Sequence, residues 1–132
     1  SVAETLDLAI RAHERRAGVD VERGFDRAGA LGAAVRHPYA ICIYRFVQEG
    51  LMNAFRHAPG AAVGVSADSR DGQVAIRVAD DGPGFDPAAR GITGLGLSGL
   101  RERVESIGGS FEIDSAPGAG TRLIMTLPAA VP

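Results

Sequence analysis

The chain has 132 residues, of which 45% are hydrophobic, and its 14 basic and 16 acidic residues leave a formal net charge of −2. This length predicts a single domain that can bury a core without crosslinks, and the charge balance provides no basic field for a nucleic acid. The single cysteine excludes an intrachain disulfide framework, and no apolar run reaches the roughly 18 residues that a membrane span requires.

The first half of the chain alternates helical and extended patterns. An amphipathic helix is predicted over 2–17, followed by a strand over 19–25 and a connection over 26–37. Pro38 then opens a long helix that runs to about His57, because proline is tolerated in a first helical turn. The apolar stripe expected on this second helix comprises Tyr44, Val47, Leu51, Ala54, Phe55 and Ala58.

The second half is dominated by short alternating segments. The predicted elements are strands over 61–67 and 73–79 joined by a turn over 68–72, a loop over 80–93, a helix over 97–107, and strands over 110–115 and 121–127. Hairpins join several neighbouring strands, and three helices remain to cover one face. We therefore expect one α+β domain over 1–132, a two-layer sandwich with a mixed, mostly antiparallel sheet.

Glycine is the unusual part of the composition. The chain has 18 glycines, about twice the usual share of roughly 7%, and ten of them lie between Gly82 and Gly120. A clustered excess indicates a local requirement of the backbone, so this part of the chain is where a functional site is expected.

A polar stripe on the second helix carries Glu49, Asn53 and His57 at intervals of four residues. One interpretation is a solvated face with an ion pair between Arg45 and Glu49, and a histidine favoured by the helix macrodipole. Asn53 favours another, since asparagine is a mediocre helix former. A metal-bridged polyphosphate would use its oxygen, and Arg56 would present a charged fork to phosphate.

Three glycine-rich motifs follow. The acids at 80–81 precede the glycines of 82–84, which suits either an acidic turn or a carboxylate that accepts the exocyclic amine of adenine. Residues 94–99 match G-x-G-x-x-G, but no strand directly precedes them, which argues against a dinucleotide fingerprint and leaves a phosphate-facing helix start. Taken by themselves, residues 118–121 indicate a tight turn.

These motifs, in this order, resemble those of the nucleotide-binding domain shared by sensor histidine kinases, gyrase-type topoisomerases, Hsp90 and MutL. The likeness is greatest to two-component sensor kinases of the nitrate/degradation-sensor type. Residues 44–58 resemble the N box, 80–85 and 94–103 the first two glycine boxes, and 118–121 the last. The resemblance implies a Bergerat-type ATP-binding fold with ATP and Mg²⁺ as ligands.

The resemblance also implies roles for individual residues. Asp80 would accept the adenine amino group, and Gly82 and Gly84 would let the chain pass close to the base. Asn53 and Glu49 would be the catalytic residues: Asn53 would coordinate Mg²⁺ between phosphates, and Glu49 beside it would organise the metal shell or act as a polarising base. The further nucleotide-binding residues it implies are Arg56, His57, Arg90, Gly94, Leu95, Gly96, Leu97 and Thr121, and residues 83–93 would form a mobile lid.

The expected activity is donation of the γ-phosphoryl group of Mg-ATP to a histidine on a separate dimerisation domain, and through it to a response regulator. That domain is not expected within 1–132, because His13 lacks the context of an acceptor motif. The isolated domain is then expected to be inactive without its acceptor, and cytoplasmic, with no contact to nucleic acid or membrane even where the parent protein is anchored. The alternatives are an anti-sigma-type serine kinase and a nucleotide-binding interaction module without transfer activity.

Three residues depart from the family pattern in the N box. Gly50 replaces the usual alanine, Phe55 is bulkier than the common leucine, and Arg56 stands where lysine is usual. Glycine should weaken a helix interior by up to about 1 kcal/mol, and arginine is not equivalent to lysine at a metal–phosphate site.

Overall fold

The computed structural model describes residues 1–86 and 97–128. In chain order, its elements are α1 (Val2–Ala17), β1 (Glu22–Gly24), the 3-10 helix η1 (Gly29–Gly32), α2 (His37–His57), β2 (Val63–Arg70), β3 (Gln73–Asp80), α4 (Ser98–Ser106), β4 (Ser110–Ser115) and β5 (Thr121–Pro128). This order of helices and strands confirms the predicted α+β class.

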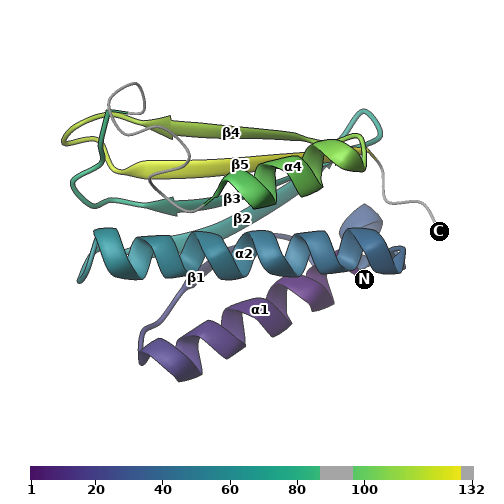
Figure 1. Cartoon of the computed structure of the whole chain (residues 1–132). Helices are drawn as coiled ribbons and strands as arrows, with labels where there is room; N and C mark the ends of the chain where they lie inside the picture. The colour runs from purple at the N-terminus through teal and green to yellow at the C-terminus, as the bar shows by residue number, and fades with distance from the viewer. Residues whose placement is uncertain (87–96, 129–132) are drawn as a thin grey trace.

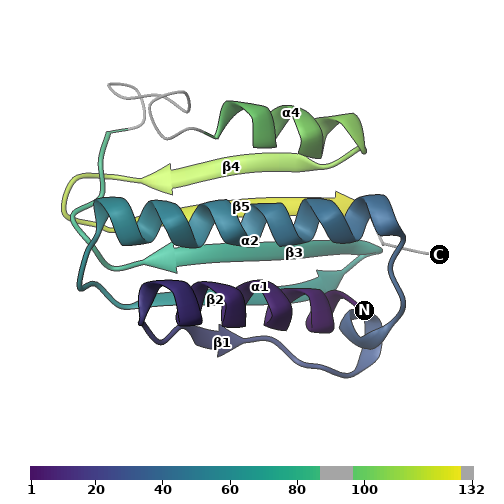
Figure 2. The same cartoon turned by 60° about the horizontal axis from the view of Figure 1, so that its bottom comes forward.

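The strands form one mixed sheet in the order β1-β2-β3-β5-β4. β1 pairs with β2 in parallel, and the other three pairings are antiparallel. The three α-helices lie side by side on one face of this sheet, with α2 between α1 and α4 (Figures 1 and 2). The predicted two-layer sandwich is therefore confirmed. Among the helices so described, none is long and apolar enough to cross a membrane.

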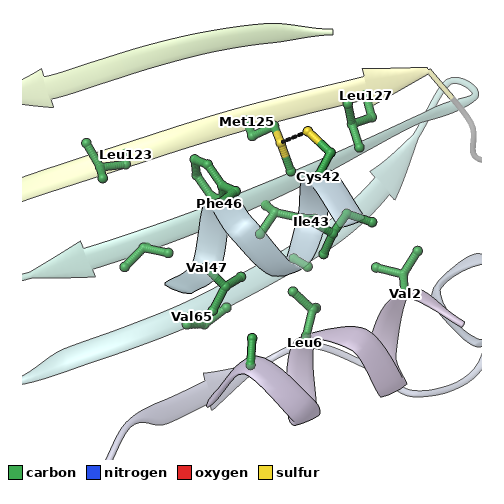
Figure 3. Close-up of a cluster of buried hydrophobic side chains, with 14 of the residues drawn as sticks. Val2, Leu6, Cys42, Ile43, Phe46, Val47, Val65, Leu123, Met125 and Leu127 are labelled. Atoms are coloured by element: carbon green, nitrogen blue, oxygen red, sulfur yellow. Dashed lines mark hydrogen bonds between the residues drawn. The ribbon is translucent and has the colours of Figure 1, made fainter. Parts of the chain in front are cut away.

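The core lies between α2 and the sheet, and side chains of α2, of the strands and of α1 all contribute to it (Figure 3). Cys42, Ile43 and Phe46 are fully buried, and Phe46 meets Phe111 of β4 edge to face with ring centroids 5.8 Å apart. The predicted stripe on this helix was wrong in part. Phe55 is 45% exposed, and the buried face of the helix instead includes Cys42, Ile43 and Phe46.

The predicted strand over 19–25 shrinks to the three residues of β1. Its ladder with β2 ends at Gly24, which is paired with Ser66, and Val21 is buried in the core just before the strand begins. The first hairpin is longer than predicted, since β2 continues to Arg70 and leaves a two-residue turn. Asp71 and Gly72 in that turn both have positive φ, of 52° and 74°, as in the turns that match the twist of paired strands.

Candidate functional site

A cavity of about 270 Å³ opens where the C-terminal half of α2 meets the ends of β3 and β5. We call it the α2–sheet cavity. Its lining combines apolar side chains with a few polar ones: Gly50, Asn53, Ala54, Arg56, His57, Ala58, Val78, Asp80, Pro83, Gly84, Phe85, Thr121 and Leu123. An apolar hollow with a small number of placed polar groups is the usual form of a small-molecule site.

Asn53 carries a buried polar side chain that the fold leaves unsatisfied. Its side chain is only 7% exposed, and within 1–86 and 97–128 neither its Oδ1 nor its Nδ2 has a hydrogen-bond partner. A buried amide without partners costs about 1–3 kcal/mol of stability. Because Asn53 lines the α2–sheet cavity, its amide is positioned to bind a ligand there.

Asp80 ends β3 and turns its carboxylate into the same cavity. Burial raises the pKa of this carboxyl group. The Gly82 N–H, which donates to Oδ1 at 2.9 Å, opposes the increase, the neighbouring Asp81 adds to it, and the Thr121 N–H opposes it. These backbone donors hold the carboxylate in the wall of the cavity. A group held this way is suited to accept a hydrogen bond from an amine.

Asp81 has a different role from its neighbour. Its Oδ1 accepts the Ala62 N–H at 2.8 Å, and its own N–H donates to the Ala62 carbonyl at 3.2 Å. This exposed side chain therefore ties the end of β3 to the segment before β2, and it takes no part in the lining of the cavity.

The glycines after Asp80 allow segments of the chain to approach one another closely. A Cβ on Gly82 would clash with Ala58, and one on Gly84, where φ is +64°, would clash with the carbonyl of Ala116. At Gly120 (φ +73°) a Cβ would meet the Asp80 carbonyl. The space that these glycines leave is filled by protein, so they shape the wall of the cavity by bringing its backbone segments together.

Ser115 is a site residue that the sequence reasoning missed. Its hydroxyl accepts the Phe85 N–H at 3.0 Å, donates to the Gly120 carbonyl at 2.8 Å, and lies 3.0 Å from the Thr121 hydroxyl. It thereby connects the segment after β3 to the turn before β5. The register of the predicted hairpin gives one part of this role, since Ser115 pairs directly with Thr121.

The close packing of α2 on β3 explains why Gly50 departs from the family pattern. Gly50 lies in the interior of α2, where a Cβ would come within 3.0 Å of the Cβ of Val78 on β3. Glycine lets the helix approach the sheet at the floor of the cavity. The loss of helix propensity is therefore offset by close packing.

The sequence-predicted site residues fall into three groups. The structure brings together Asn53, Arg56, His57, Asp80, Gly84 and Thr121 in the lining of the α2–sheet cavity, with Gly82 adjoining it through Asp80. Glu49 and Leu97 lie outside that lining: Glu49 borders a second hollow, and Leu97 is fully buried in the core. Arg90, Gly94, Leu95 and Gly96, with most of the expected lid over 83–93, lie outside the described residues.

The donor set fits a cation held jointly with a ligand. Across 1–86 and 97–128, no three His, Cys, Asp or Glu side chains gather into a metal cluster. The orphaned oxygen of Asn53 is nevertheless the kind of ligand that Mg²⁺ prefers, and Mg²⁺ commonly binds through one or two protein groups plus substrate phosphates. The residues present therefore fit Mg²⁺ bound with a nucleotide.

Comparison with known protein sequences identifies the family. The family model described as histidine kinase-, DNA gyrase B- and HSP90-like ATPase matches residues 39–131. The signal transduction histidine-protein kinase/phosphatase DegS of Brevibacillus brevis is 30% identical over 124 residues, which are 94% of this chain and 31% of that protein. The sensor protein VraS of Staphylococcus saprophyticus is 35% identical over 86 residues, 65% of this chain and 25% of that protein.

Solved structures share the fold. The blue-light activated histidine kinase of Erythrobacter litoralis EL346 superposes with a TM-score of 0.75 at 23% identity, over 95% of this chain and 41% of that one. The mycobacterial sensor histidine kinase MprB gives a TM-score of 0.70 at 25% identity, over 96% of this chain and 93% of that one. The chain spans a quarter to a third of the length of the curated relatives it matches. Its matched residues place it in the histidine kinase-, DNA gyrase B- and HSP90-like ATPase family, alongside the ATPase domains of sensor histidine kinases.

Proposed function

We propose that this domain binds Mg-ATP in the α2–sheet cavity and donates the γ-phosphoryl group to a histidine on a separate dimerisation domain of a two-component sensor kinase. The observation that carries this proposal is the convergence of two polar groups on one cavity. The unpartnered amide of Asn53 faces it from α2, and the oriented carboxylate of Asp80 faces it from β3.

Each group has a defined task in this proposal. Asp80 accepts the amino group of adenine against the apolar side chains of Val78, Phe85 and Leu123, while Asn53 holds the cation that bridges the phosphates. Arg56 and His57 are exposed at the rim of the cavity and neutralise phosphate charge. Catalysis in phosphoryl transfer is mostly positioning and charge stabilisation, so no nucleophile is required within this chain.

Glu49 acts on the acceptor side of the reaction. It lies four residues before Asn53, one helical turn or about 6 Å along α2. When the γ-phosphorus bond to the bridging oxygen breaks and a bond to the imidazole nitrogen forms, ADP leaves the cavity and the acceptor stays outside it. Glu49 is positioned to orient and polarise that imidazole.

The decisive experiment is calorimetric titration of Mg-ATP into the wild type and the Asp80→Asn variant. Asparagine offers an uncharged oxygen in place of the carboxylate, so we expect affinity to fall about 10- to 100-fold, the equivalent of a lost charge-assisted hydrogen bond. Asp20→Asn is the matched control, because Asp20 is exposed and lies beyond the end of α1.

Circular dichroism of both variants shows whether the fold is retained. Equal affinity of wild type and Asp80→Asn would contradict the assignment of the base site. Transfer is tested separately with labelled ATP and the purified dimerisation domain of the parent kinase. Nucleotide binding without any transfer would indicate that the domain is an interaction module. Acid-stable phosphoserine on a protein partner would indicate a serine kinase instead.

A further inference from the structure

A second hollow of about 240 Å³ lies between α2 and α4, the helices that stand side by side in Figure 2. We call it the arginine cleft. Arg45 and Glu49 line it from α2, and Gly99, Leu100 and Arg103 line it from α4. Among the described residues, none lines both this cleft and the α2–sheet cavity.

The charged groups of the arginine cleft have no partners within the described part of the chain. Arg45, Glu49 and Arg103 form no ion pair there, so the ion pair that the sequence suggested between Arg45 and Glu49 is not made. On the same helix α4, by contrast, Arg101 pairs with Glu105 at 3.5 Å. The fold thus leaves two guanidinium groups converging on one hollow with their hydrogen-bonding capacity unused.

Arg103 faces α2 across the cleft. Burial raises the pKa of the Cys42 thiol on α2, and the charge of Arg103 acts in the opposite direction. The lining of the cleft independently places Arg103 on the side of α4 that faces α2. The two arginines therefore approach the cleft from opposite walls, the arrangement that lets guanidinium groups grip a planar anion.

The charge of the cleft selects the type of anion. Two arginines and one glutamate sum to +1, which one carboxylate neutralises. A polyphosphate carries several negative charges and would meet the repulsion of Glu49 without a cation to offset it. The orphaned amide that suits a metal–phosphate group lies one turn away, in the α2–sheet cavity.

We propose that the arginine cleft binds a single carboxylate side chain of the phosphoacceptor domain and so holds that domain beside Glu49. This inference rests on the proposed function. The arginine cleft adjoins the phosphate end of the α2–sheet cavity, since Glu49 borders the cleft and Asn53, one helical turn away, lines the cavity. A carboxylate gripped by Arg45 and Arg103 brings the surface that carries it within reach of the transferred group.

The first test observes the arginines directly. The full chain labelled with ¹⁵N-arginine is titrated with acetyl-glutamate-amide, with acetyl-glutamine-amide as the uncharged control, and the side-chain Nε–Hε signals are followed by NMR. We expect saturable shifts at Arg45 and Arg103 with the carboxylate alone, and none at Arg101. Equal shifts at Arg45, Arg103 and Arg101 would show that the carboxylate responds only to the general positive charge of the surface. Shifts produced by Mg-AMP-PNP and not by the carboxylate would make the cleft a phosphate subsite, and both outcomes overturn the proposal.

The second test measures transfer. The Arg45→Gln/Arg103→Gln variant is compared with the wild type for phosphorylation of the separately purified acceptor domain, with Arg101→Gln as the control for charge on α4. We expect the KM for the acceptor domain to rise about tenfold or more, as for a lost charge-assisted hydrogen bond, with the Kd for Mg-ATP unchanged. Wild-type transfer with an unaltered KM in the variant overturns the cleft proposal alone. Absent transfer by the wild type overturns the proposed function, and the NMR titration then decides the cleft.

Discussion

Asp80 and Asp81 show how adjacent residues of the same type acquire different roles. Alternation along β3 places Val74, Ile76 and Val78 on the buried face, so Asp80 continues that face into the cavity while Asp81 points away. This division follows from the sequence, because strand periodicity fixes it. Ser115 does not follow as easily, since the residue whose N–H it accepts, Phe85, is 30 positions away.

Asn53 is expected to lower the free energy of unfolding of the nucleotide-free domain while supporting the binding of Mg-ATP. Replacing Asn53 by Leu, a residue of similar size, removes a buried amide that has no partner. We expect the free energy of unfolding without nucleotide to rise by about 1 kcal/mol, measured by urea denaturation. The same variant should lose the thermal shift that Mg-ATP gives the wild type. A less stable variant would show that the amide has a partner in the folded protein.

The packing of α1 on α2 contains the buried histidine of the chain. His13 is 3% exposed, its Nδ1 has no hydrogen-bond partner in the described part of the chain, and its ring meets Phe55 edge to face at 6.2 Å. Burial lowers the pKa of His13, the Arg16 charge lowers it further, and Glu14 acts against both. The exposed Phe55, which departs from the family pattern, covers this ring and thus belongs to the helix–helix contact.

This contact should make stability depend on pH. A histidine whose pKa is lower in the folded state contributes stability above its unfolded value of 6.5 and loses that contribution as pH falls through the folded value. The free energy of unfolding should therefore fall more steeply below pH 6.5 for the wild type than for His13→Phe. Urea denaturation at pH 7.5 and pH 5.5 measures the difference, with His37→Gln, an exposed histidine, as the control. Parallel pH profiles for wild type and His13→Phe would contradict it.

The molecule as a whole was largely predictable because its local patterns agree with its fold. The alternation of helices and hairpins sufficed for the two-layer class, and the glycine cluster pointed to the ends of β3 and β5. The details that failed depend on contacts between distant segments. β1 is short because its pairing with β2 ends at Gly24. The buried face of α2 differs from the predicted stripe because Phe46 packs on Phe111 of β4 and Cys42 on Met125 of β5. Nothing in the local sequence of α2 specifies these partners.

The buried pair of sulfur atoms shown in Figure 3 allows the opening of the core to be measured by thiol labelling. Cys42 is the single cysteine, is fully buried, and lies 3.8 Å from the sulfur of Met125. A thiol reagent can reach it only when α2 parts from β5, so the labelling rate measures how often the core opens. If opening also empties the cavity, Mg-ATP at 100 times its Kd should slow labelling about 100-fold, and Asn53→Leu should abolish that slowing. A rate indifferent to nucleotide would mean that the core opens while the cavity stays intact.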